Sequence, residues 1–237
     1  MDDNEVQKKG HDMRIGIIGA MQVEVELLRS HMQDATTTDV YGMSFTEGRL
    51  GCKDVVLVAG GVGKVNAAMC ALTLIERFGV QRIVFTGVAG SLDSKVDILD
   101  VVVSTACVHH DYDVSQVFPF EKPVYFEADA ALRAAAVRAV AEAVPEVTTY
   151  EGIVASGDQF VADAAVKRKI VDTFGALCCE MEGAAVAQVA CNCGVPYVVI
   201  RAISDKADGS AEVAFDTFVQ QAANHSAAVI ERLMELL

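Results

Sequence analysis

Three acidic residues stand where apolar runs of the sequence come to an end. Glu24 follows the run that closes with Gly19 and Met21, while Glu182 and Asp205 follow later runs that are typical of buried strands. Ligands of open α/β sheets bind outside the carboxyl ends of the strands, so we expect these carboxylates to converge at one edge. Carboxylates that shift one another's pKa can divide into a general acid and a general base. The pattern indicates an enzyme.

Each of these acids also has an ordinary structural explanation. Asp205 could be a helix N-cap, and Glu24 could be a solvated residue that the dipole of a helix favours in its first turn. The functional interpretation gains weight because three acids coincide at three strand ends. Arg201 stands just upstream of Asp205 and adds a cation to the same edge.

Two glycine-rich turns, at residues 60–64 and 87–91, match neither common nucleotide-binding template. Val65 stands where a Walker A loop needs Ser or Thr, and residues 61–66 lack the last glycine of the dinucleotide fingerprint. Tight strand-to-helix turns need glycine for backbone reasons alone. We therefore expect no nucleotide cofactor.

A histidine- and aspartate-rich segment at residues 109–113 is the strongest metal candidate. His109, His110, Asp111 and Asp113 carry side chains of the kinds that bind zinc. The flanking sequence offers no further ligand at a typical spacing, and such short motifs have low specificity. The cysteines at 178–179 and at 191 and 193 are interpreted as core residues. We expect no metal.

Composition favours one large α/β domain. The chain has 237 residues, of which 52% are hydrophobic, and only four prolines. Its net charge of −14 argues against a nucleic-acid partner. No apolar stretch has the length of a membrane span, the N-terminus has no signal-peptide pattern, and seven cysteines fit a reducing compartment, so we expect a cytoplasmic protein. Residues 1–12 are polar and predicted to be a disordered tail or an expression remnant, which leaves 13–237 as the domain.

Strand and helix patterns alternate along this domain without a linker or a repeat. Strands are expected near residues 14–20, 41–50, 54–59, 82–86, 100–108, 148–155, 176–179 and 197–203. Helices are expected near residues 21–31, 64–78, 128–143, 162–174, 182–193 and 215–237. The simplest architecture is a single three-layer α/β/α domain with a central mixed sheet.

Six short motifs occur in one order along the chain. They are Gly-Ile-Ile-Gly-Ala-Met with Glu24, Gly63-Lys64-Val65, Thr86-Gly87-x-Ala89-Gly90, Ser156-Gly157-Asp158-x-Phe160, Glu180-Met181-Glu182 and Arg201-Ala202-Ile203-Ser204-Asp205. From about Met13 to the C-terminus the chain resembles the bacterial 5′-methylthioadenosine/S-adenosylhomocysteine nucleosidase family. The resemblance implies a nucleoside phosphorylase-like fold and a homodimer. It also implies hydrolysis of the N-ribosidic bond of these two nucleosides, with release of adenine and without metal or cofactor.

The resemblance also implies roles for individual residues. Asp205 would be the acid that protonates N7 of adenine, with Ser204 helping to position it, and Glu24 would deprotonate the attacking water. Glu182 would bind the ribose hydroxyls. The other implied substrate contacts are Met181 and Arg201 beside Glu182, Phe160 and the backbone of Val161 at adenine, and Met21, Val62, Val88 and Phe215 around the ribose and 5′ substituent.

The segment His109–Pro123 corresponds to one that reaches the neighbouring active site in this family. Val114 and Phe118 could cover an apolar 5′-alkylthio group there, and the alternative is ordinary dimer packing. Val88 stands where many relatives carry serine, which removes a polar contact near the ribose but leaves the acid and the base in place.

One additional substrate and two rival functions are compared with this interpretation. The loops at 86–92 and 156–161 also resemble relatives that cleave 6-amino-6-deoxyfutalosine in the futalosine route to menaquinone, and the sequence leaves this extra substrate open. A purine nucleoside phosphorylase would need cations for phosphate, whereas here Glu24 occupies the first loop and residues 87–91 contain no arginine. A non-catalytic nucleoside-binding protein would not need both Glu24 and Asp205.

Overall fold

The protein is described by a computed structural model that covers residues 13–114, 117 and 122–237. The predicted tail at 1–12 and the assignment of Phe118 lie outside these residues. Ten strands form one mixed sheet: β1 (Ile15–Gly19), β2 (Gln33–Val40), β3 (Met43–Leu50), β4 (Lys53–Ala59), β5 (Arg82–Ser91), β6 (Val101–His109), β7 (Tyr125–Glu127), β8 (Thr149–Ser156), β9 (Cys178–Glu180) and β10 (Tyr197–Asp205). The helices are α1 (Gln22–His31), α2 (Lys64–Phe78), α3 (Ala130–Ala143), α4 (Ala164–Phe174), α5 (Gly183–Asn192) and α6 (Ala211–Leu236).

The sheet follows the order β10-β6-β8-β9-β5-β1-β4-β3-β2, with β7 paired to β6. β10 also pairs with β5 in parallel, so β5, β10, β6, β8 and β9 close into a ring. β1, β4, β5 and β10 run in parallel, whereas β3 and β6 run antiparallel to their neighbours β4 and β10. The carboxyl ends of β1, β5 and β10 therefore meet at one edge.

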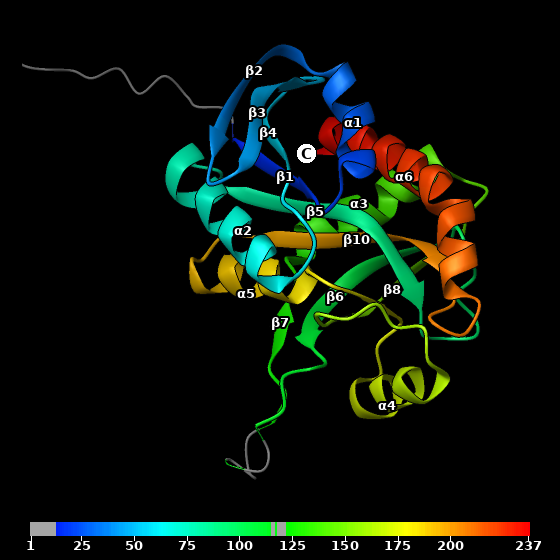
Figure 1. The fold of residues 1–237 in the computed structure, drawn as a ribbon. Coiled ribbons are helices and arrows are strands. Elements are labelled where there is room, and N and C mark those ends of the chain that lie inside the picture. The colour runs from blue at the N-terminus through cyan, green and yellow to red at the C-terminus, as the bar shows by residue number, and fades with distance from the viewer. Residues whose placement is uncertain (1–12, 115–116, 118–121) are drawn as a thin grey trace, which may run out of the picture.

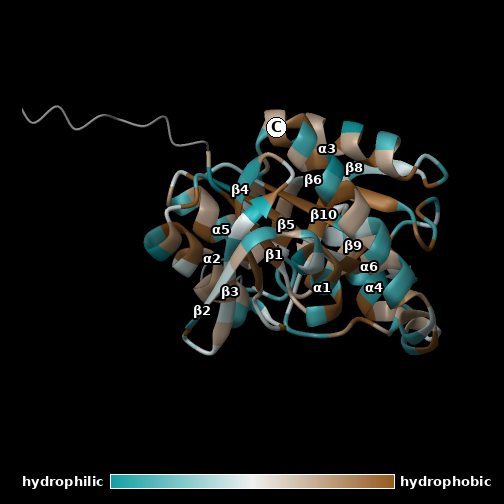
Figure 2. Ribbon diagram, turned by 90° about the horizontal axis from the view of Figure 1, so that it is seen from above, coloured by the Kyte–Doolittle hydropathy of each residue, from teal (hydrophilic) through white to brown (hydrophobic). Residues whose placement is uncertain are grey.

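Side chains of the central strands point alternately to the two faces of the sheet, and the apolar residues on each face form a separate core layer. Ile18 and Phe85 belong to a core cluster shared with α2 and α5, whereas Ile17 and Val84 belong to one shared with α1, α3 and α6. This is the period-2 pattern of a sheet that is covered on both faces. The helices lie on opposite sides of the strands (Figure 1), and the strands form the apolar centre of the molecule (Figure 2). The predicted three-layer α/β/α fold with a central mixed sheet is confirmed.

Helix boundaries follow local chemistry. The Asp163 carboxylate accepts hydrogen bonds from the backbone N–H groups of Ala165 and Val166 at the start of α4. α2 and α4 end at Gly79 and Gly175, whose φ angles of 63° and 62° place them in the left-handed region that glycine favours. These caps fix the loops that lead back to the sheet.

The structure differs from the sequence prediction in five places. Residues 87–91, predicted as a glycine-rich turn, continue β5 to Ser91. Cys191 and Cys193, interpreted as core residues, are exposed at the end of α5. β2 was not predicted, because seven of its eight residues are exposed and it carries no apolar alternation. β7 was also missed, and it has only three residues. α6 begins at Ala211 rather than Phe215, because Asp208 binds the backbone N–H and hydroxyl of Ser210 and orders the turn before it. Among the described residues, no helix combines the length and the apolarity needed to cross a membrane.

Candidate active site

Glu24 lies in the first turn of α1, directly beyond the carboxyl end of β1. Its Oε2 accepts a hydrogen bond from the Met21 N–H (2.8 Å) and its Oε1 accepts one from the Val88 N–H (3.1 Å). The residue is only 3% exposed, and burial raises the pKa of its carboxyl. A Cβ on Gly87 would lie 2.6 Å from Glu24 Oε1, so glycine is needed there for the carboxylate to reach β5. Such a buried carboxylate can act as a base near neutral pH.

Asp205 is the last residue of β10 and is also 3% exposed. Its Oδ2 accepts a hydrogen bond from Ser204 Oγ (2.8 Å), and its Oδ1 accepts one from the Ala207 N–H (2.8 Å). Burial raises the pKa of the Asp205 carboxyl. A Cβ on Gly90 would lie 2.7 Å from Asp205 Oδ1, so this glycine too makes room for a carboxylate. A proton on Asp205 is therefore retained at higher pH than on a free aspartate.

The two carboxylates contact the same strand two residues apart. Glu24 meets β5 at Val88, and Asp205 meets it at Gly90. Two residues of a strand span about 6–7 Å. Hydrolysis by direct water attack needs a base and an acid on opposite sides of the scissile glycosidic bond, and two separately held carboxylates can fill these roles.

Glu182 stands at the N-cap position of α5, with Met181 just before it. Its Oε1 accepts a hydrogen bond from the Gly63 N–H at 2.7 Å, which joins the loop after β4 to the end of β9. Burial, together with the negative charge of Glu180, raises the pKa of the Glu182 carboxyl to about 7. Val62 precedes Gly63 and is exposed. The remaining oxygen of Glu182 can accept from a polyol.

A buried ion pair lies beneath these acids. Arg201 is 1% exposed, its Nη2 lies 2.5 Å from Glu180 Oε2, and its guanidinium carbon lies 3.9 Å from the ring centroid of Phe85. The Glu180 carboxylate also accepts hydrogen bonds from Ser156 Oγ and the Gly183 N–H. Glu180 appeared in the sequence analysis only inside a motif and without a role. The need of a buried Arg201 for a counter-charge is the signal that could have identified it.

Two aromatic rings from different elements contact each other. Phe160, in the loop between β8 and α4, lies edge-to-face on Phe215 of α6, with ring centroids 5.9 Å apart and an interplanar angle of 83°. Phe160 is 47% exposed, whereas Val161 is buried in a core cluster with α4 residues. The exposed ring offers a flat apolar surface on which a planar base can stack.

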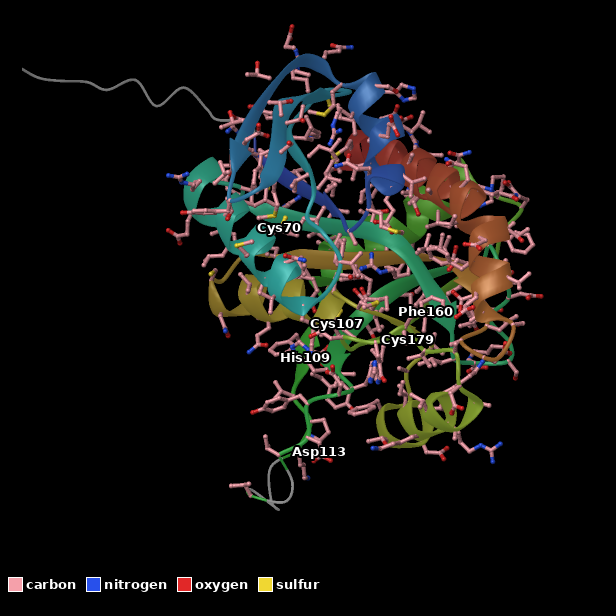
Figure 3. The ribbon with its side chains drawn as sticks, viewed as in Figure 1. Cys70, Cys107, His109, Asp113, Phe160 and Cys179 are labelled. Atoms are coloured by element: carbon pink, nitrogen blue, oxygen red, sulfur yellow. The ribbon has the colours of Figure 1, made fainter. Side chains whose placement is uncertain are left out.

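A groove of about 1150 Å³ adjoins Glu182 through Lys64, which follows the Gly63 that binds Glu182. Its lining residues include Val114, His109 and Asp158 but not Glu24, Glu182 or Asp205. Lys64 Nζ lies 2.5 Å from Asp111 Oδ1, and His109 Nε2 lies 3.0 Å from Gln188 Oε1. His109 lies at the end of β6 and Asp113 farther out along a protruding loop (Figure 3). Within the part of the chain that the structure describes, no three His, Cys, Asp or Glu side chains are grouped as metal ligands.

The structure thus brings five of the predicted residues together around two centres. Glu24 accepts hydrogen bonds from the backbone of Met21 and Val88. Asp205 accepts one from Ser204 and contacts β5 at Gly90. Val114 stands apart from them in the groove.

Comparison with known proteins identifies the family of this chain. The profile described as the phosphorylase superfamily matches residues 14–235. A Bacillus cereus (strain AH187) protein named 5′-methylthioadenosine/S-adenosylhomocysteine nucleosidase is 42% identical over 235 residues, which cover 95% of this chain and all of the relative. The chain belongs to this nucleosidase family. A Shewanella halifaxensis member is 40% identical over 232 residues, with coverage of 95% of this chain and 100% of the relative.

Solved structures of the family share the whole fold. The nucleosidase of Neisseria meningitidis, in complex with methylthio-immucillin-A, matches with a TM-score of 0.91 and 35% identity, over 95% of this chain and 100% of that chain. The futalosine hydrolase of Helicobacter pylori matches with a TM-score of 0.89 and 35% identity, over 95% of this chain and 98% of that chain. The predicted membership of the nucleosidase family is confirmed.

Proposed function

We propose that the protein hydrolyses the N-ribosidic bond of 5′-methylthioadenosine and S-adenosylhomocysteine and releases adenine. The observation that carries this proposal is the pair of buried carboxylates, Glu24 and Asp205, that meet β5 two residues apart. The names of its relatives, nucleosidases of these two compounds, support the same substrates. We further propose that residues 13–237 form one nucleosidase domain.

Asp205 would supply the acid. As the C1′–N9 bond breaks, its electron pair moves into the adenine ring, and the proton on Asp205 moves to N7, so that adenine leaves as a neutral base. This step requires Asp205 to be protonated, which its burial favours. Ser204 would hold the carboxyl in place through its bond to Oδ2.

Glu24 would supply the base. Departure of adenine leaves an oxocarbenium-like sugar, and the oxygen of a water on the opposite face forms a new bond to C1′ while Glu24 accepts a water proton. The main-chain N–H groups of Met21 and Val88 hold the carboxylate in position for this transfer. A positioned acid or base of this kind contributes typically about 10²–10⁴-fold in rate.

The remaining residues would bind the nucleoside. Glu182 would accept hydrogen bonds from the ribose hydroxyls, with Met181 and Arg201 beside it. Phe160 would stack on adenine, and the Val161 backbone would read its edge. The residues proposed to line the ribose and the 5′ substituent are Met21, Val62, Val88, Phe215 and Val114.

Water is favoured over phosphate as the nucleophile. A phosphate anion needs cations at the point of attack. The Glu24 carboxylate faces β5 there, and Arg201, which approaches the same point, is already paired with Glu180. The test is adenine release from methylthioadenosine in phosphate-free buffer and in phosphate. Equal rates support hydrolysis, whereas a requirement for phosphate would replace the proposal with a phosphorylase, and no release in either buffer would favour a binding protein.

A second substrate is suggested by one structural neighbour. The Helicobacter pylori protein is called a futalosine hydrolase. The groove of about 1150 Å³ that Val114 lines would hold the larger 5′ group of such a substrate. We propose that 6-amino-6-deoxyfutalosine is also cleaved, which would link the protein to menaquinone synthesis. Relative kcat/KM values for the three nucleosides, measured by adenine release, test this, and no release from the futalosine derivative would remove it.

We also propose a cytoplasmic homodimer. Val65, Met69 and Leu72 form an exposed apolar stripe on α2, and Val65 also lines the groove that contains Val114. A second copy on this face would cover the stripe and bring its own His109–Pro123 segment near the neighbouring site. All seven cysteines are free, which fits a reducing compartment. Sedimentation equilibrium of the full chain checks the dimer, and a monomer at all concentrations would refute it.

A further inference from the structure

The Arg201 guanidinium has one ion-pair partner among the described residues, the Glu180 carboxylate. Arg201 Nη2 lies 2.5 Å from Glu180 Oε2, and Arg201 Nε lies 3.2 Å from the same oxygen. Two N–H groups of a planar fork on one carboxylate restrict the orientation of the guanidinium. The ring of Phe85, 3.9 Å below it, restricts the plane further. The direction of this cation is therefore set by Glu180.

Glu180 is itself held from the opposite side. Its oxygens accept hydrogen bonds from the Gly183 N–H at 2.8 and 3.0 Å, at the start of α5, and from Ser156 Oγ. Ser156 Oγ in turn accepts from the Ala184 N–H at 2.7 Å. The N-terminal end of a helix favours a negative charge. Glu180 is thus a fixed anion between α5 and Arg201.

Arg201 also lies close to Glu24. A Cβ on Gly87 would meet Glu24 Oε1 at 2.6 Å and Arg201 Nη1 at 3.1 Å, so both groups approach the same point of β5. The Glu24 oxygens nevertheless bind main-chain N–H groups. The carboxylates that act on Arg201 besides Glu180 are Glu24 and Glu182. Without Glu180, the positive charge of Arg201 would act on Glu24 and Glu182 with no ion-pair partner to neutralise it.

We propose that Glu180 is a positioning residue that binds the Arg201 guanidinium and thereby keeps Glu24 available as the base. The proposal rests on the function proposed above, in which Glu24 accepts a proton from water. A carboxylate in direct contact with arginine is a weak base, because the opposite charge stabilises its ionised form. Glu180 takes that contact. Burial raises the pKa of Glu24, and the charge of Arg201 offsets only part of that rise.

Other titratable groups also face this ion pair. Glu24 is faced by Arg201 of β10, and Glu182 is faced by Glu180, Arg201 and Glu24. The charge of Glu180 also acts on several titratable groups of the neighbouring elements. These groups are Arg201 of β10, Cys107 and His109 of β6, His110 after β6, Cys178 and Cys179 of β9, and Glu182 at the start of α5. A pH profile alone therefore mixes several titrations, and the test needs a direct measurement at Glu24.

The test is Glu180→Gln, compared with the wild type and with the control Glu142→Gln, which removes a carboxylate of an exposed ion pair with Arg232. The pKa of Glu24 is measured by ¹³C NMR of the glutamate carboxyls, with Glu24→Gln to assign the signal. We expect Glu180→Gln to lower the pKa of Glu24 by about one unit or more, because the charge of Arg201 is no longer neutralised. The acid limb of the kcat/KM profile for adenine release should move to lower pH in parallel, and Glu142→Gln should change neither.

Each outcome decides the proposal. A purely structural role for Glu180 would lower stability or rate but leave the pKa of Glu24 unchanged, and that result would overturn the proposal. If Glu180→Gln does not fold, the double variant Glu180→Gln, Arg201→Met removes both buried charges together. With the cation gone as well, the pKa of Glu24 should stay at the wild-type value or rise above it, and a lowered pKa would count against the proposal. Absence of adenine release by the wild type would refute the proposed function. The NMR titration would still show whether Glu180 keeps the charge of Arg201 from lowering the pKa of Glu24.

Discussion

The acids at the strand ends and the groove beside them are built in different ways. Glu24 and Asp205 are almost fully buried and bind main-chain N–H groups, whose positions the sheet and its loops fix. The groove is lined by side chains that bind one another, such as Lys64 with Asp111 and His109 with Gln188. Backbone partners hold a reacting group with little freedom, whereas side-chain partners can rearrange. The difference suggests that the chemistry is rigid and that the substrate tail is bound by an adaptable surface.

The largest effect is expected from the acid. Asp205→Asn keeps an oxygen for the Ala207 N–H but carries no transferable proton, so kcat for adenine release should fall by about 10²–10⁴-fold. KM should change little, because the groove is untouched. Asp172→Asn, at an exposed position of α4, is the matched control and should be silent. A kcat within a few-fold of wild type would remove Asp205 from the acid role.

A smaller effect is expected from the aromatic surface that Phe160 and Phe215 form. Stacking of a base on an aromatic ring contributes about 1–3 kcal/mol. Phe160→Ala should therefore raise KM for methylthioadenosine by roughly tenfold or more, with a smaller change in kcat. Phe160→Tyr retains the ring and should restore KM. Steady-state kinetics of both variants decide this, and an unchanged KM for the alanine variant would show that adenine does not stack there.

Loss of the proposed partner should affect the groove side. Met69→Asp places a charge in the exposed stripe of α2, so the homodimer should dissociate. Without the partner, the 5′-methylthio group of the substrate would be exposed to water. The binding free energy would then weaken by about 1–2 kcal/mol, which corresponds to an increase of roughly tenfold in KM. Sedimentation and kinetics on the same sample test both statements. A monomeric variant with wild-type KM would show that the 5′ end is complete in one chain.

The effect of pH on KM through ribose binding should be equal to or smaller than the effect of Met69→Asp. With a pKa of about 7, Glu182 becomes protonated as the pH falls below 7 and loses acceptor capacity for the ribose hydroxyls. KM should therefore rise by up to about tenfold between pH 8 and pH 6 in the wild type. Glu182→Gln has no such titration, and its KM should be higher at pH 8 and flatter across this range. A wild-type KM that stays constant would contradict the role of Glu182.

The sequence predicted the central strands and the acids at their ends because both leave local signals. Apolar runs such as residues 82–86 identify buried strands. The glycine-rich segment 87–91 resembles a turn in the sequence but continues β5, and its Gly87 and Gly90 leave room for the carboxylates of Glu24 and Asp205. β2 left no signal, because an edge strand with exposed polar residues buries no face. The pairing of Glu180 with Arg201 joins residues 21 positions apart on different strands, which no local pattern encodes. The roles of the site residues stay predictions until the variants are measured.

The division of labour between Glu24 and Asp205 is tested most directly with a leaving group that needs no proton. The substrate is the 4-nitrophenyl glycoside of 5-methylthioribose, which departs as a stable anion, and the measurement is nitrophenolate release by the wild type, Asp205→Asn and Glu24→Gln. Asp205→Asn should cleave this glycoside at close to the wild-type rate while it fails on methylthioadenosine, and Glu24→Gln should fail on both. An equal loss of both activities in Asp205→Asn would contradict its role as the acid.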